Sequence, residues 1–167
     1  MVSWSHRRVC EKLRACNLNG TGYVALDWQW EEIESTAPGG ESLAVRARFA
    51  GLEGYLLSKC TAVRNRAAEK DYYDLPYVLI HNREGGPQKA AERLLEGKLS
   101  AATRSLKSTF REIGARYNSP SDFAPQCYAT QMLLVDPELD EAILRTDAVV
   151  AIAEFIEMLV PRPSGQV

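Results

Sequence analysis

Histidine and closely spaced cysteine, the usual ligands of zinc, are scarce in this chain. Its 167 residues hold two histidines and four cysteines, with no Cys-x-x-Cys pair among them (His6, His81, Cys10, Cys16, Cys60 and Cys127). Structural zinc sites need such ligands at short, regular spacings. We therefore expect no metal site on these residues, and reduced thiols of the kind found in cytoplasmic proteins.

Long apolar runs are missing as well. No stretch approaches the roughly 20 consecutive apolar residues that span a bilayer. Residues 1–20 also lack the apolar core of a secretory signal. These two absences predict a cytoplasmic protein with no membrane partner.

Neither sign of charge is in large excess. The formal net charge is -2, and 46% of the residues are hydrophobic and 25% charged, which is ordinary for one globular domain. A protein that coats nucleic acid would be strongly basic. A helix predicted at Ser3–Asn17 does carry Arg7, Arg8, Lys12 and Arg14. These residues leave contact with nucleic acid open, beside the alternative of a solvated surface.

Two stretches alternate between apolar and polar residues, as strands with one buried face do. They are Gly22–Trp30 and Ser42–Phe49, separated by the polar, turn-rich segment Glu31–Gly40. We predict that they form an antiparallel pair with a long connection.

The remainder of the chain has the periodicity of helices. The predicted helices are Leu52–Ala68, Asp71–His81, Gln88–Glu96 after an initial Pro87, Ser100–Tyr117, Ala124–Leu134, one N-capped by Asp136, and Asp147–Val160. The last is apolar on nearly all sides, which predicts a central or interfacial position. Pro76 predicts a kink or a late start in the second helix.

These elements predict an α+β fold, in which a small antiparallel sheet with an N-terminal helix is followed by a C-terminal helical bundle. Residues 1–160 would form one domain. Residues 1–50 would hold the first helix and the strand pair, and residues 51–160 the helical part. A flexible tail would follow at 161–167.

One lysine lies where an apolar residue is expected. Lys59 falls within an apolar stripe of the helix predicted at 52–68, formed by Leu52, Tyr55, Leu56, Cys60 and Val63. An ammonium group there is unfavourable unless it reaches water, a carboxylate or an anionic ligand. Arg66 and Lys70 would follow on the same line if the helix continued. Three cations in a row would suit a polyphosphate.

The neighbouring carboxylates allow two explanations. Asp71 opens the next predicted helix, where capping alone explains an aspartate. It would otherwise position Lys59 or face a substrate, and Asp74 is a second carboxylate one turn later. The alternative for Lys59 is that it extends to the surface or pairs with a structural aspartate.

The same residues carry a resemblance to a known family. The segment Gly54-Tyr-Leu-Leu-Ser-Lys59-Cys-Thr-Ala-Val-Arg-Asn-Arg66-Ala-Ala-Glu-Lys70-Asp71-Tyr-Tyr-Asp74-Leu75 resembles the third motif of the AbiEii-type nucleotidyltransferase-like toxins. These belong to the DNA polymerase β-like superfamily. The stretch from Ala37 to Val45 is similar to the strand region that precedes this motif in bacterial relatives. The resemblance covers residues 35 to 80, and the rest of the helical part in outline.

The resemblance implies a nucleotide-binding head followed by a helical bundle. It implies that Lys59 contacts a nucleoside triphosphate, that Asp71 belongs to the active site, and that Arg66 and Lys70 are anion contacts. NTP and Mg²⁺ would be the substrate and cofactor if the family activity is retained. Such enzymes transfer a nucleotide to an acceptor, often the acceptor end of a tRNA.

Two further motifs of that family are missing from the sequence. The family places Gly-Ser and then Asp-x-Asp before this segment, and its aspartates hold the magnesium ions. No Asp-x-Asp occurs here, and Gly39-Gly-Glu-Ser42 is only a superficial match to the first motif. Asp27 is considered as an additional carboxylate, against the alternative of a solvent-facing strand residue.

The sequence therefore supports three hypotheses. The first is a truncated nucleotidyltransferase-like domain with a nucleotide- or anion-binding pocket, incomplete as a transferase by itself. The second is a non-catalytic interaction module, such as a homodimer or the partner of another protein, that uses the last helix or an exposed sheet edge. The third is an enzyme of other chemistry in which Lys59 and Asp71 act as acid and base on a small acidic substrate.

Overall fold

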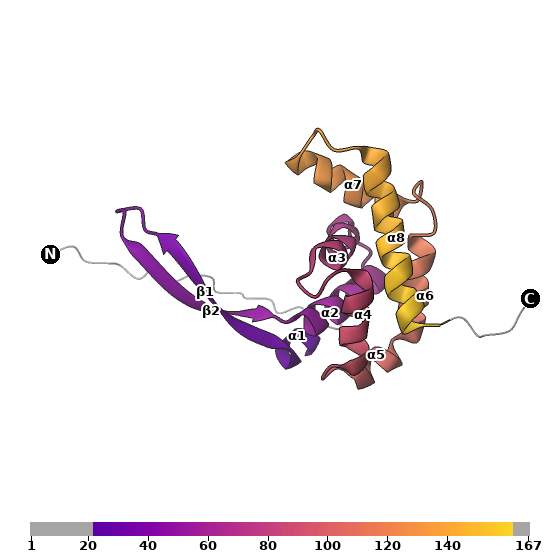
Figure 1. The fold of residues 1–167 in the computed structure, drawn as a ribbon, viewed down its shortest axis with the longest axis horizontal. Coiled ribbons are helices and arrows are strands. Elements are labelled where there is room, and N and C mark those ends of the chain that lie inside the picture. The colour runs from indigo at the N-terminus through magenta and orange to yellow at the C-terminus, as the bar shows by residue number, and fades with distance from the viewer. Residues whose placement is uncertain (1–21, 162–167) are drawn as a thin grey trace, which may run out of the picture.

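A computed structural model describes residues 22–161 and has the expected α+β architecture (Figure 1). A two-stranded antiparallel sheet is followed by a helical part. The elements are α1 (Gly22–Leu26), β1 (Trp28–Thr36), β2 (Ser42–Ala50), α2 (Leu52–Asn65), α3 (Glu69–His81), α4 (Pro87–Glu96), α5 (Ser100–Ser105), α6 (Lys107–Arg116), α7 (Phe123–Val135) and α8 (Glu141–Leu159). The helix predicted at Ser3–Asn17 and residues 162–167 of the predicted tail lie outside the described residues.

The two strands form a ribbon that projects away from the helices (Figure 1). Their register runs from Trp28 opposite Ala50 to Thr36 opposite Ser42. The turn between them is short, with Gly40 at a φ of +87° that favours glycine. The antiparallel pairing is confirmed, whereas the long connection is wrong because most of Glu31–Gly40 belongs to β1.

The first predicted strand begins too early. Gly22–Leu26 is a short helix that packs against α2, and the chain turns into β1 only at Trp28. Alternation over so few residues fits a strand and a single helical turn equally well. The polar stretch after Trp30 can be a strand because neither face of the ribbon is buried, so alternation with a buried side is not required.

The helical part is organised around α8, which contacts α3, α4, α6 and α7. Its buried residues include Ile152 and Phe155, and the Phe155 ring meets Phe110 of α6 edge to face. A helix with neighbours on several sides needs apolar residues on several sides, which explains its composition. The predicted central position is therefore confirmed.

Two predicted helix boundaries in this part are wrong. The helix expected to begin at Asp136 and the last helix are one element, α8, capped by Asp140, whose Oδ1 accepts from the N–H groups of Ala142 (2.8 Å) and Ile143 (3.1 Å). Asp136 instead ends α7, because its N–H donates to the Met132 carbonyl. The helix predicted at Ser100–Tyr117 is divided at Leu106 into α5 and α6.

Pro76 lies inside α3 without ending it, and the expected late start is wrong. Proline cannot donate to the carbonyl of the residue four positions earlier, here Tyr72. The Tyr117 hydroxyl supplies the missing donor, at 2.7 Å from the Tyr72 carbonyl oxygen. Because both tyrosines are buried, this side chain replaces a helical hydrogen bond where water does not reach.

Removing that hydroxyl should destabilise the fold most while proline is present. We expect Tyr117→Phe to lower the free energy of unfolding by about 1–3 kcal/mol, because the Tyr72 carbonyl loses its partner. In a Pro76→Ala background, the introduced alanine supplies the helical N–H and the same change should have a smaller effect. Urea denaturation of the four proteins measures this coupling. Strictly additive effects would contradict the assignment.

Candidate functional site

The helices α2 and α3 contact each other and place the predicted site residues where they meet. The link is tight, and Ala67 adopts a φ of +49°, in the left-handed region. This turn ends α2 at Asn65, so the expected continuous line of cations along one helix is wrong. Arg66 follows the last residue of α2, and Lys70 lies in the first turn of α3. Both side chains form ion pairs with aspartates of α3.

Five side chains form one network of ion pairs, which we call the α2/α3 charge cluster. Lys59 Nζ lies 3.3 Å from Asp71 Oδ1 and also donates to Asp74 Oδ2. Arg66 binds Asp71 through two contacts, Nε to Oδ2 at 2.6 Å and Nη2 to Oδ1 at 2.8 Å. Lys70 Nζ lies 3.0 Å from Asp74 Oδ1. The structure thus brings together Lys59, Arg66, Lys70, Asp71 and Asp74.

The carboxylates lie inside and the cations lie toward solvent. The exposed fractions of the side chains are 0% for Asp71, 17% for Lys59, 48% for Arg66 and 76% for Lys70. A buried carboxylate is tolerated when it is paired and hydrogen-bonded. The cluster therefore also explains, without any ligand, how Lys59 is accommodated in the apolar stripe.

Asp71 remains ionised at neutral pH. Burial by itself raises the pKa of Asp71, but the hydrogen bond from Arg66 and the charge of Lys59 outweigh it and hold that pKa below its usual value. The same hydrogen bond raises the pKa of Arg66. Asp71 is consequently a weak general base, which disfavours the acid–base hypothesis for this pair. Three cations against two carboxylates leave one positive charge in excess.

Asp27 is not the solvent-facing strand residue that one of its two interpretations expected. It lies in the bend between α1 and β1, it is buried, and its Oδ2 accepts from the Gly54 N–H at 3.0 Å. Lys98 Nζ lies 2.9 Å from its Oδ1. Burial raises the pKa of Asp27, but these two partners outweigh it and keep the pKa low. Asp27 therefore caps the first turn of α2. The N-cap residue, Gly51, has no side chain that could do so.

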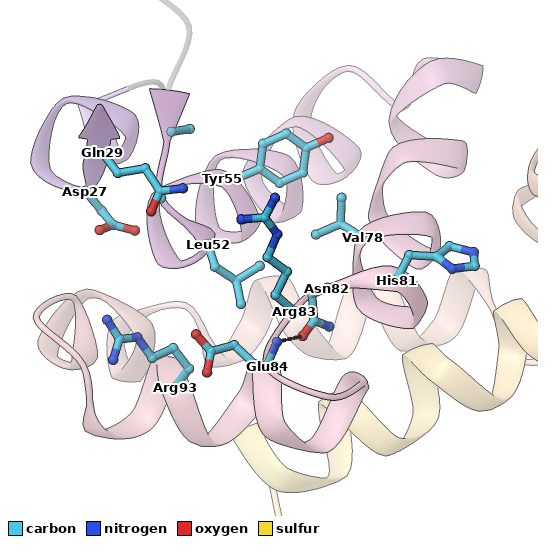
Figure 2. Close-up of a pocket in the computed structure, with 12 residues that line it drawn as sticks. Asp27, Gln29, Leu52, Tyr55, Val78, His81, Asn82, Arg83, Glu84 and Arg93 are labelled. Carbon is cyan, nitrogen blue, oxygen red and sulfur yellow. Dashed lines mark hydrogen bonds between the residues drawn. The ribbon is translucent and has the colours of Figure 1, made fainter. Parts of the chain in front are cut away.

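A pocket with a volume of about 370 Å³ has the lining drawn in Figure 2. It lies between the base of the ribbon, the start of α2, the end of α3 and α4. Its lining includes Tyr55, His81, Arg83 and Arg93, none of which was proposed from the sequence as a site residue. Tyr55 was assigned to the apolar stripe, and Arg83 lies in a loop where no periodicity marks it.

Tyr55 joins the pocket to the cluster. Its ring lines the pocket, and the ring centroid is 5.6 Å from Lys59 Nζ. Burial, and then the charges of Asp74 and Asp71, raise the pKa of Tyr55 to about 12. The hydroxyl is therefore protonated at neutral pH and available as a hydrogen-bond donor.

Among residues 22–161, no group of three or more His, Cys, Asp or Glu side chains is arranged to hold a metal ion. Cys60 and Cys127 are free thiols. No helix in this part of the chain is both long and apolar enough to cross a bilayer. Comparisons of the chain with protein families, curated proteins and solved structures returned no match.

The low pKa of Asp71 predicts a pH-dependent contribution to stability. The unfolded chain takes up this proton at a higher pH than the folded protein does. The contribution is therefore complete above the unfolded pKa of about 4 and is lost as the pH falls through that value toward the folded pKa. We expect Asp71→Asn to lower the free energy of unfolding by about 1.5–3 kcal/mol at pH 7.

The difference between the two proteins should shrink below about pH 4, where the unfolded wild-type chain takes up a proton that the folded protein does not. Urea denaturation at a series of pH values measures it. Asp122→Asn is a control that removes an aspartate outside the cluster. A difference that stays constant from pH 7 to pH 3 would argue that Asp71 contributes by shape and not by charge.

Proposed function

We propose that this chain is a nucleotidyltransferase-like domain that binds the polyphosphate of a nucleotide at the α2/α3 charge cluster, and that it is not a complete transferase by itself. The observation that carries the proposal is the contact of Lys59 with Asp71. The resemblance to AbiEii-type proteins had assigned both residues to one site, and their side chains come within 3.3 Å.

The charge distribution supports an anion as the ligand. Lys70 and Arg66 present their charged ends to solvent, and Lys59 remains partly exposed beside them. An arriving phosphate would accept hydrogen bonds from donors that the aspartates hold in place. Asp71 and Asp74 would thus act as positioning residues that hold the three cationic side chains close together despite their mutual repulsion.

The sequence also limits the proposal. Phosphoryl-type transfer depends on metal ions that neutralise the phosphates, and the chain has no Asp-x-Asp motif to hold them. Mg²⁺ would therefore arrive with the nucleotide or be held by another polypeptide. A cytoplasmic location, where Mg²⁺-bound NTP is abundant, is part of the same proposal.

Loss of Lys59 should weaken binding of nucleotide and of bare polyphosphate to the same extent. We expect Lys59→Met to raise the Kd of Mg²⁺–ATP and of Mg²⁺–tripolyphosphate about tenfold or more, because a charge-assisted hydrogen bond contributes about 1.5–3 kcal/mol. Lys70→Met should give a smaller rise. Isothermal titration calorimetry measures both constants.

Lys107→Met is the matched control, since Lys107 is an exposed lysine on α6 outside the cluster. Because Lys70 is exposed, Lys70→Met still tests the cluster if Lys59→Met does not fold. The proposal fails if neither ligand binds the wild-type protein, or if both lysine variants of the cluster bind as tightly as Lys107→Met.

The ribbon supports a second candidate function, that of a homodimerisation module. One of its faces, here called the aliphatic face, carries Ile33, Leu43, Val45, Ala47 and Phe49, together with Gln29, Glu31 and Ser35. Its four large apolar side chains are exposed, and within residues 22–161 each strand has a single partner. Isolated hairpins are marginal in water and exposed apolar sheet faces associate. We propose that the aliphatic faces of two copies pack together.

A charge in the middle of this face should separate the copies. We expect the wild-type chain to have about twice its monomer mass of 18.6 kDa in size-exclusion chromatography with light scattering, and Val45→Lys to be monomeric. Ala44→Lys places the same charge on the opposite face of the same strand and should remain dimeric. A monomeric wild-type protein throughout the micromolar range would contradict this second function.

A further inference from the structure

The pocket beside Tyr55 has one apolar wall and an open, polar rim. Leu52 of α2 and Val78 of α3 are partly buried and supply apolar surface, together with Ala50 at the end of β2. The volume of about 370 Å³ is at the lower end of the range for small-molecule sites, about 300–1,000 Å³. The space therefore suits part of a small ligand better than a peptide.

Two of the four charged side chains that line this pocket already have partners, whereas Arg83 and Glu84 have none among residues 22–161. Asp27 is bound by Lys98 and the Gly54 N–H. Arg93 Nε lies 3.3 Å from Oε1 of the buried Glu53, whose Oε2 accepts from the Leu99 N–H. These pairs join α2 to the α4–α5 connection, and they hold the Asp27 carboxylate and the Nε side of the Arg93 guanidinium against the protein.

Arg83 is different. Within residues 22–161 its guanidinium makes no ion pair or hydrogen bond, although it lies in the lining of the pocket. Figure 2 shows its side chain extending from the α3–α4 loop into the space between Leu52, Tyr55 and Val78. A guanidinium is planar and weakly hydrated, so it stacks on flat ring systems as well as binding anions.

The pocket and the charge cluster are also adjacent. The Tyr55 ring lines the pocket, and its centroid lies 5.6 Å from Lys59 Nζ, so Tyr55 contacts both. A ligand whose phosphates reach Lys59 would therefore place the group attached to those phosphates next to Tyr55. A single ligand with phosphates at the cations and a flat ring against Leu52 and Val78 would be a nucleotide.

This inference rests on the proposed nucleotide-binding function and extends it to the other end of the ligand. We propose that the pocket beside Tyr55 binds the nucleoside part of the nucleotide, with the heteroaromatic ring between Arg83 and the apolar wall of Leu52 and Val78. Arg83 is thereby assigned as a binding residue that selects nucleotides over bare polyphosphate.

Comparison of Mg²⁺–ATP with Mg²⁺–tripolyphosphate separates the two ends of the site. Arg83→Lys keeps the positive charge and removes the planar guanidinium group. We expect it to raise the Kd of ATP about threefold to tenfold, as expected for a lost cation–π contact, and to leave the Kd of tripolyphosphate unchanged. Arg104→Lys, at an exposed arginine of α5, is the matched control.

A second variant tests the space itself. Ala50→Leu adds bulk at the mouth of the pocket and should weaken ATP alone, whereas Ala44→Leu adds the same bulk near the far end of the ribbon and should have no effect. Isothermal titration calorimetry with both ligands measures all four variants and the wild-type protein.

The outcomes distinguish this inference from the function on which it rests. If both ligands bind through Lys59 but ATP is insensitive to Arg83→Lys and Ala50→Leu, the nucleoside assignment is overturned and the polyphosphate site stands. If Arg83→Lys weakens both ligands equally, Arg83 is a phosphate contact and the assignment is also overturned. If neither ligand binds, or binding ignores Lys59, both proposals fail.

Discussion

The fold of the described residues depends on the ion pairs between Lys59 of α2 and the two aspartates of α3. Asp71 is fully buried, and Asp74 nearly so, at the junction of two helices that would otherwise present apolar residues to each other. Two carboxylates without partners could not be buried there. Because Lys59 contacts both, it fixes how α3 lies on α2, and the pocket beside Tyr55 follows from that arrangement.

That junction also connects the structural and functional interpretations of the cluster. Pairing of Lys59 with an aspartate was foreseen both as a structural alternative to an anion site and, with Asp71, as part of a functional site, and the structure contains that pair. The two are compatible, since cations held by inner carboxylates keep outward N–H groups for a ligand. The excess of one positive charge would attract a phosphate, as the proposed function requires. The low pKa of Asp71 keeps the carboxylate that holds Lys59 and Arg66 ionised.

Local sequence signals predicted the features that depend on few residues. Pro87 starts α4, the apolar face of α2 is buried, and the two strands pair in antiparallel order, since each follows from periodicity or backbone chemistry. The contact of Lys59 with Asp71 was foreseen from the need of a lysine in an apolar stripe for a carboxylate. Contacts between residues distant in sequence were not foreseen, such as those of Tyr117 with the Tyr72 carbonyl and of Glu53 with the Leu99 N–H. The left-handed turn at Ala67 was missed because alanine does not mark a left-handed residue.

The central claim, that Lys59 binds phosphate while paired with Asp71, can be observed directly at its ammonium group. The measurement is a titration of the lysine side-chain ¹H–¹⁵N signals in NMR with Mg²⁺–tripolyphosphate, after assignment of Lys59, Lys70 and Lys107 by single substitutions. We predict saturable shifts at Lys59 and Lys70 with one common affinity, and no shift at Lys107. Unchanged Lys59 and Lys70 signals at saturating ligand would contradict the account and leave the cluster as a purely structural ion-pair network.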